Sequence, residues 1–210
     1  MAVSKSDVIS SNNYLSEAEK QINATYIAQY LLGYGWTLNA ICGMLGNMEQ
    51  ESNINPGVWQ DLEYGDLVDG YGLVQWTPAT NLINWCNSMG LAHNDIDSQL
   101  KRILYELDNG VQFYPSWYSD MTFSEYVVST LSPEELARIF VYNYERAGDV
   151  HMDNRTTAAR KWFNYLNGNV SPEIPDTPDT PVTPDPPVTP DTYKGHKMSL
   201  LMMYQATRRR

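Results

Sequence analysis

Cysteine and histidine are scarce in this chain of 210 residues, which contains two cysteines and three histidines. Two cysteines, Cys42 and Cys86, are too few for a disulfide scaffold, so we interpret both as small buried hydrophobic side chains. The histidines His93, His151 and His196 are isolated from one another and from any cysteine pair. The sequence therefore predicts no bound metal and no cofactor.

Long hydrophobic runs are also missing. The first twenty residues lack the apolar stretch of a secretion signal, and no segment approaches the roughly 18 apolar residues that span a bilayer. We therefore expect neither a signal peptide nor a transmembrane segment.

Positive charge is in short supply, because 14 Lys and Arg residues stand against 25 Asp and Glu residues, for a net charge of −11. This balance opposes binding to phosphate backbones, so we expect no nucleic-acid partner. Aromatic residues, in contrast, are plentiful, with 15 Tyr, 6 Trp and 4 Phe. Tyr and Trp combine an apolar face with a polar group, which suits half-exposed grooves that bind carbohydrate.

Composition changes sharply near residue 170, because eight of the twelve prolines lie between Ser171 and Thr192. Their Pro-Asp-Thr and Pro-Val-Thr units favour an extended spacer. The sequence thus predicts four parts: a flexible N-terminus at 1–12, a folded domain at 13–169, a Pro/Thr/Asp-rich linker at 170–192 and a short basic, apolar segment at 193–210. For that last segment, a docking peptide for another protein, a weak membrane-surface contact and a disordered end are the alternatives.

Most of the predicted domain is helical. Apolar periodicity and capping residues predict helices at 17–33, 37–52, 79–89, 96–109, 122–130, 133–146 and 152–167. The glycine-rich segment 53–77 between them predicts loops and a small β-hairpin. The expected fold class is α+β, mainly helical.

Two acids end the second predicted helix, Glu49 and Glu51, where the chain enters the glycine-rich segment. A half-buried carboxyl group there would have the raised pKa that a general acid for glycosidic-bond cleavage needs. The helical wheel does not choose between the two acids, and a solvated helix end is the alternative.

A second group of polar residues follows in the segment Gly72-Leu73-Val74-Gln75-Trp76-Thr77-Pro78. The amide of Gln75 can donate and accept hydrogen bonds toward sugar hydroxyl or N-acetyl groups. The indole of Trp76 either stacks on a pyranose ring or belongs to the core.

The motif Glu51-Ser52-x-Ile54-Asn55-Pro56, followed by this second segment, resembles the lysozyme-like domain of bacteriophage tail proteins that degrade peptidoglycan. More distantly it is similar to goose-type lysozymes and soluble lytic transglycosylases. Tail-knob lysins of small podoviruses share the sequences at 40–48 and 75–78. The resemblance covers residues 13–167 and implies a lysozyme-like fold. Those lysins continue into a zinc metallopeptidase domain, where this chain has its proline-rich segment.

The resemblance also selects residues. It implies that Glu51, the glutamate followed directly by Ser, is the general acid. It further implies that Ser52, Gln75, Trp76 and Tyr144 bind substrate, with core packing as the alternative for Tyr144. We interpret Glu145 and Arg146 as an ion pair that braces the cleft.

A second catalytic carboxylate is expected as base or nucleophile. Glu63 is our choice, because the tail-knob relatives also carry an acid there, and the alternatives are the neighbouring acids Asp61, Asp66 and Asp69. Without a second carboxylate, the muramic 6-hydroxyl would attack and form a 1,6-anhydro product.

The predicted function is that of a phage muramidase, which cleaves the β-1,4 bond between N-acetylmuramic acid and N-acetylglucosamine for cell-wall penetration or lysis. Its expected partners are peptidoglycan and, through the C-terminal segment, other phage tail proteins. It would act on the virion tail or be released to the host wall. A lytic transglycosylase, a catalytically silent wall-binding module and a structural tail component are the alternatives. Retention of Glu51 with Ser52 and Gln75 argues against a silent module, because a pure binder needs no buried acid.

Overall fold

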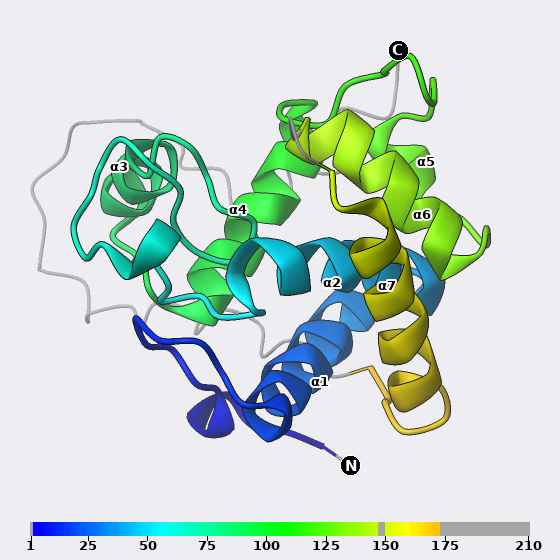
Figure 1. The fold of residues 1–210 in the computed structure, drawn as a ribbon, viewed down its shortest axis with the longest axis horizontal. Coiled ribbons are helices and arrows are strands. Elements are labelled where there is room, and N and C mark those ends of the chain that lie inside the picture. Colours follow the sequence, from blue (N-terminus) through cyan, green and yellow to red (C-terminus); the bar gives the residue numbers. More distant parts are fainter. Residues whose placement is uncertain (1, 147–149, 173–210) are drawn as a thin grey trace, which may run out of the picture. The chain divides into compact units, whose positions relative to one another are not determined.

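A computed structural model of the chain describes residues 2–146 and 150–172. Residues 173–192 of the predicted linker and the predicted segment 193–210 lie outside the described residues. Within the described part the chain forms seven α-helices (Figure 1). Their bounds are α1 (Glu17–Gly33), α2 (Leu38–Ser52), α3 (Thr80–Met89), α4 (Ile96–Asn109), α5 (Phe123–Val127), α6 (Pro133–Phe140) and α7 (Met152–Leu166).

The helices begin where their capping residues predict. Ser16 accepts a hydrogen bond from the backbone of Glu19, whose side chain accepts one back from the backbone of Ser16, so α1 starts with a capping box. Thr37 caps α2, and Ser132 caps α6 with Pro133 at the first helical position. These local signals confirm the starts predicted for the three helices.

Helix α2 is the centre of the domain. Every residue from Ala40 to Met48 is buried, and the helix packs against α1, α5, α6 and α7. Glycine permits two of these approaches: a Cβ at Gly43 would lie 2.7 Å from Leu136 Cβ of α6, and one at Gly46 would lie 2.4 Å from the carbonyl oxygen of Arg155 in α7. Such distances are shorter than van der Waals contact, so alanine does not fit at either position.

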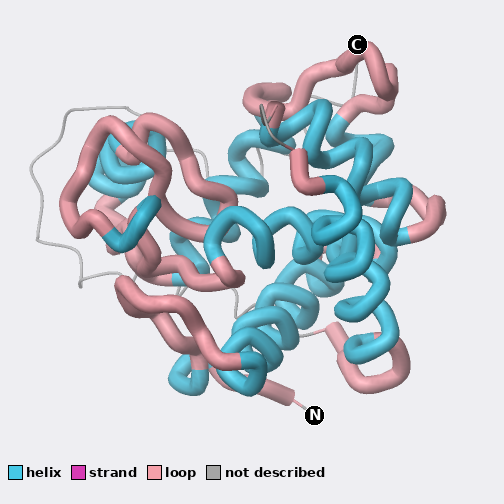
Figure 2. The backbone as a smooth tube through the Cα atoms, viewed as in Figure 1, coloured by secondary structure: helices cyan, strands magenta, loops and turns pink. Residues whose placement is uncertain are grey.

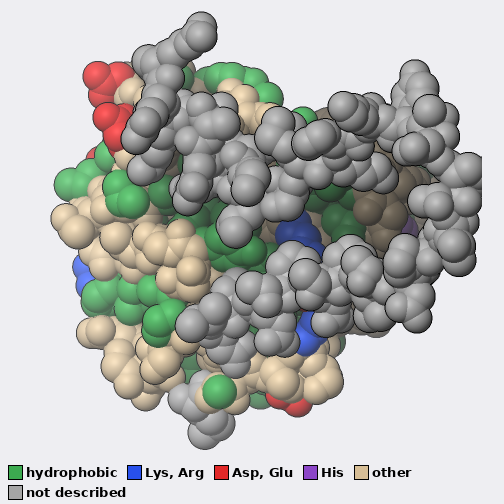
Figure 3. All heavy atoms as spheres, turned by 180° about the vertical axis from the view of Figure 1, so that it is seen from behind, with side chains coloured by type: hydrophobic (Ala, Val, Ile, Leu, Met, Phe, Trp, Pro, Cys, Tyr) green, Lys and Arg blue, Asp and Glu red, His purple; other side chains and the backbone are tan. Residues whose placement is uncertain are grey.

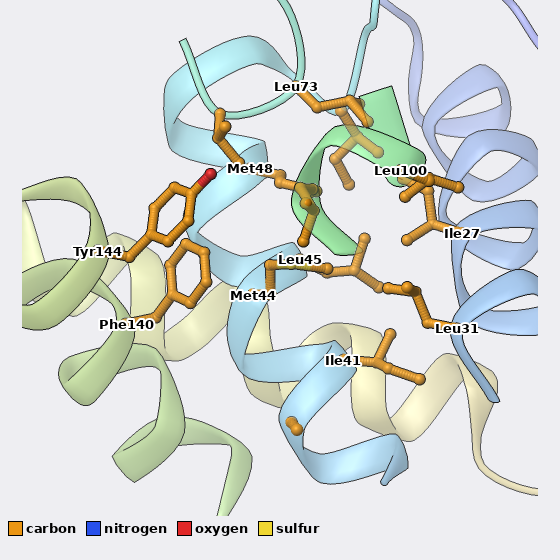
Figure 4. Close-up of a cluster of buried hydrophobic side chains, with 14 of the residues drawn as sticks. Ile27, Leu31, Ile41, Met44, Leu45, Met48, Leu73, Leu100, Phe140 and Tyr144 are labelled. Atoms are coloured by element: carbon orange, nitrogen blue, oxygen red, sulfur yellow. The ribbon is translucent and has the colours of Figure 1, made fainter. Parts of the chain in front are cut away.

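The hydrophobic core surrounds α2 on several sides (Figure 4). Ile27 and Leu31 of α1 face Ile41 and Leu45 of α2 in this view, and the rings of Phe140 and Tyr144 lie on its other side, as the figure shows. Cys42 and Cys86 are both free and buried, which confirms their interpretation as hydrophobic packing residues.

The predicted β-hairpin in segment 53–77 is not confirmed, since the described residues contain two isolated β-bridges and no strand (Figure 2). Left-handed backbone conformations at Asp61 and Gln75, with φ of 53° and 48°, interrupt extended pairing. Side chains satisfy the loop backbone in place of a strand ladder. For example, Gln99 Oε1 accepts from the backbone N–H of Leu73, and Asn12 Oδ1 from that of Trp59.

Two helices end earlier in the structure than the sequence predicts. The segment predicted at 122–130 ends at Val127, and the one predicted at 133–146 changes at Val141 into a short π-helix, η3 (Val141–Glu145). Single π-turns of this kind change the direction of the side chains that follow and are frequent at functional sites.

Residues 3–12, for which the sequence predicts a flexible N-terminus, contact the rest of the domain. The backbone of Val3 forms two hydrogen bonds with the side-chain amide of Gln29. The backbone of Ile9 forms two with the side-chain amide of Asn23. Asn55 bonds both the N–H and the carbonyl of Ser11. The N-terminal segment thus lies against α1 and the loop after α2.

In the described part of the chain, no helix combines the length and the apolar character needed to cross a membrane. Several large hydrophobic side chains remain exposed, among them Trp117 at 81%. Figure 3 shows hydrophobic side chains of described residues among neutral ones on the face opposite to that of Figure 1.

Candidate functional site

A pocket of about 360 Å³ lies where three segments of the domain meet. The last turn of α2 contributes Glu51, the glycine-rich segment contributes Gln75 and Trp76, and η3 contributes Tyr144 and Glu145. Four of the residues predicted for the site therefore line one cavity, although they are far apart in the sequence.

Glu51 is held by Arg155 of α7. Nη2 of Arg155 donates to Oε1 of Glu51 over 2.6 Å, and the two side chains are 3% and 20% exposed, respectively. The guanidinium is itself fixed, because it also donates to Asn47 Oδ1 over 2.9 Å and to the carbonyl oxygen of Val150 over 2.7 Å. This arrangement fixes the direction of the carboxyl group of Glu51.

Glu49 lies outside the pocket lining and has other partners. Its carboxylate accepts hydrogen bonds from Lys20 over 2.6 Å, from Lys161 over 2.7 Å and from the indole of Trp162 over 2.9 Å. These contacts join α2 to α1 and α7. The structure thus separates two acids that the helical wheel leaves equivalent.

A buried acid connects two of the residues that line the pocket. Glu106 of α4 is completely buried and accepts hydrogen bonds from Trp76 Nε1 over 2.9 Å, from Arg102 Nε over 2.8 Å and from the hydroxyl of Tyr144. Burial raises the pKa of Glu106, and these three donors act in the opposite direction. The network fixes the positions of Trp76 and Tyr144.

These contacts determine what Trp76 and Tyr144 present to the pocket. Both side chains are buried, and the ring of Tyr144 stacks on Phe140 with centroids 4.5 Å apart (Figure 4). Because their polar atoms are engaged by Glu106, they offer aromatic surface rather than free donors.

Gln75 and Ser52 also use their polar groups internally. The amide nitrogen of Gln75 donates to the carbonyl oxygen of Gly72 over 3.0 Å, within the loop that lines the pocket. The hydroxyl of Ser52 is buried and donates to the carbonyl oxygen of Leu73 over 2.7 Å. Ser52 is not among the pocket-lining residues and ties the end of α2 to the glycine-rich segment.

Glu63 does not join this group. It caps the short 3-10 helix η2 (Gln60–Leu62), is exposed, and does not belong to the pocket lining. The acid that lies in the pocket with Glu51 is instead Glu145, which the sequence interpretation pairs with Arg146. The guanidinium of Arg146 lies 5.2 Å from the centre of the Tyr114 ring.

Sequence reasoning misses Arg155 and Glu106, and it does not predict that Glu145 lines the pocket. Glu106 leaves a signal, since it lies three residues after Ile103 on the apolar side of α4, where an acid needs partners. Arg155 leaves none, because it meets Glu51 across 104 positions of the sequence.

Comparison with known proteins identifies a matching family and a related phage protein. The profile of the phage tail lysozyme family matches residues 22–166. The chain is also 52% identical over 167 residues to morphogenesis protein 1 of Bacillus phage B103. That alignment covers 79% of this chain and 45% of the relative, so the chain spans less than half the length of the curated relative it matches.

Proposed function

The chain belongs to the phage tail lysozyme family, and on this basis we propose that it cleaves bacterial peptidoglycan at the β-1,4 bond between N-acetylmuramic acid and N-acetylglucosamine. The observation that carries the proposal is the pocket itself. It combines a fixed carboxyl group, Glu51, with the aromatic surface of Trp76 and Tyr144, in a cavity large enough for part of a glycan.

In this proposal Glu51 delivers a proton to the oxygen that leaves with the departing sugar. The C1–O bond then breaks through an oxocarbenium-like transition state, and the pocket holds the sugar ring in place for that step. Arg155 orients the carboxyl group of Glu51, and the hydrogen bond from the Ser52 hydroxyl to the carbonyl oxygen of Leu73 holds the glycine-rich segment against the end of α2. Gln75 and Trp76 would then contact the N-acetylated sugars.

The relative from phage B103 is named a morphogenesis protein, which supports a place on the virus particle. We infer that this chain acts with other phage tail proteins at the host wall, during wall penetration. Peptidoglycan is then its substrate and the tail its physical context.

Mass spectrometry of muropeptides tests the reaction type. Purified peptidoglycan is digested with the full-length chain, and the products are examined before and after borohydride reduction. A muramidase leaves reducing muramic acid ends that borohydride converts, whereas transglycosylation leaves 1,6-anhydro ends, lighter by one water and resistant to reduction. Reducing ends would support the proposal, anhydro ends would replace it by lytic transglycosylation, and undigested glycan would contradict both.

A further inference from the structure

We propose that Glu145 is the second catalytic carboxyl group of the pocket and that it carries one proton jointly with Glu51 through the reaction. This inference rests on the proposed function, since it names the partner of Glu51 in the same site. It assigns the second acid of the pocket to η3 rather than to the glycine-rich segment.

The first support is position. Glu51 lies in the last turn of α2 and Glu145 is the last residue of η3, yet both line the same cavity of about 360 Å³. One oxygen of Glu145, Oε1, is buried and has no hydrogen-bond partner among the residues that the structure describes. A buried carboxyl oxygen without a partner is costly unless a ligand, a water or a reacting group uses it.

The second support is the difference between the two environments. Glu51 receives a charge-assisted hydrogen bond from Arg155, which orients its carboxyl group. Burial raises the pKa of Glu145 well above its usual range, and the charges of Glu51 and Glu106 raise it further, while Arg155 and Arg146 act in the opposite direction. In the resting protein Glu145 therefore holds its proton.

A protonated Glu145 in the same pocket can supply the proton that Glu51 delivers as the general acid. When two acids interact, their protons belong to the pair rather than to either residue. Glu145 thus supplies the proton that Glu51 delivers.

The proposed cycle balances. The proton of Glu145 moves to Glu51, and Glu51 passes it to the leaving oxygen as the C1–O bond breaks. Water then adds its oxygen to C1 and gives its proton to the carboxylate of Glu145. One bond is hydrolysed, and the pair again holds one proton.

Kinetics of Glu145→Gln and Glu145→Asp in the full-length chain test the role, with Asp120→Asn as an exposed acid-to-amide control outside the pocket. We expect Glu145→Gln to lower kcat by roughly 100-fold or more, with little change in chitooligosaccharide affinity. Glu145→Asp restores part of the rate at a shifted pH optimum, because it restores a titratable carboxyl group. The control remains near the wild type.

An NMR titration of carboxyl-labelled glutamate provides a readout independent of activity. Removal of the Glu51 charge by Glu51→Gln should lower the pKa of Glu145, because the carboxylate of Glu51 raises it. If the pKa of Glu145 is the same in Glu51→Gln as in the wild type, the proposal that the two acids share a proton is wrong. This result can be obtained even if Glu145→Gln fails to fold.

The kinetic outcomes separate the two proposals. If the wild type cleaves glycan and folded Glu145→Gln keeps its rate within threefold, the role of Glu145 is wrong and the proposed function stands. The same holds if Glu63→Gln loses activity in place of Glu145→Gln. If the wild type cleaves no glycan, the proposed function itself fails.

Discussion

The guanidinium of Arg155 in the first turn of α7 binds the carboxylate of Glu51 in the last turn of α2, with Nη2 and Oε1 2.6 Å apart. The same arginine bonds Asn47, one turn earlier on α2. One side chain thus fixes the catalytic candidate and joins the two helices that enclose it. A substitution of Arg155 is therefore expected to affect both the stability of the domain and the position of Glu51.

Replacement of Arg155 by Met should destabilise the domain by roughly 3 kcal/mol, because the change leaves a half-buried carboxylate without its charge partner. Urea unfolding measures this loss. Arg138→Ala is the matched control, since its ion pair with Glu135 is long and exposed, at 3.9 Å, and should contribute about 0–1 kcal/mol. Equal losses in the two variants would contradict the structural role of Arg155.

Replacement of Trp76 by Phe should cost about 1–3 kcal/mol of unfolding free energy, because buried Glu106 loses the indole donor. Thermal unfolding and chitooligosaccharide affinity are measured separately on this variant. The control is Trp117→Phe, an exposed position where we expect a change within about 0.5 kcal/mol. Weakened affinity without a loss of stability would show that Trp76 acts as a stacking surface rather than as part of the buried network.

Stability should fall as the pH rises above the ordinary glutamate pKa of 4.5, because burial raises the pKa of Glu145 in the folded state. At pH values between the pKa of Glu145 in the unfolded chain and its raised pKa in the folded protein, the folded protein binds more protons. The stabilisation that Glu145 contributes is therefore complete below pH 4.5 and is lost as the pH rises through the pKa of the folded state. Glu106 acts in the same direction. Urea unfolding of Glu145→Gln across this range should give a flatter pH profile than the wild type, and identical slopes would argue against a protonated Glu145.

A chain that ends at residue 172 should retain the unfolding free energy of the full-length protein within about 0.5 kcal/mol. The compact unit that contains the pocket ends near this point, and Val170 still packs against the core. Its cleavage of soluble fragments should also be unchanged. A lower Tm for the shortened chain would show that residues 173–210 contribute to the fold of the domain.

Residues 173–210 contain charges of both signs in separate parts: five acids lie in 173–191 and five cations in 193–210. If the cations tether the chain to an anionic surface, full-length protein should outperform the shortened chain on intact walls at low salt and lose this advantage at high salt. Equal rates on intact walls at both salt concentrations would rule out the tether.

The sequence predicted the helices well because their signals are local. The capping box of Ser16 and Glu19 and the Ser132-Pro133 start each involve residues within one turn, and apolar periodicity supplies the rest. The glycine-rich segment was harder, because the side chains of Asn12 and Gln99 that satisfy its backbone come from distant parts of the chain. A hairpin was therefore predicted where loops form.

In the candidate site, too, some residues could be predicted from a local motif and others depend on contacts between distant parts of the chain. Glu51, Gln75 and Tyr144 were selected by a motif resemblance, and the structure brings them to one pocket. Arg155 and Glu145 were not selected, because their importance depends on contacts made across the fold. A charged residue near a helix end looks the same in sequence whether it faces solvent or an acid that lines a pocket.

Lysis of purified cell walls by Glu51→Gln and Glu49→Gln tests the central claim most directly. The two acids lie two positions apart on α2, but Glu51 lines the pocket and Glu49 binds Lys20, Lys161 and Trp162 outside it. With circular dichroism confirming that each variant is folded, we expect Glu51→Gln to lose turbidity-clearing activity and Glu49→Gln to keep it at reduced stability. Near-wild-type lysis by Glu51→Gln, with Glu49→Gln inactive, would contradict the assignment of the pocket as the active site.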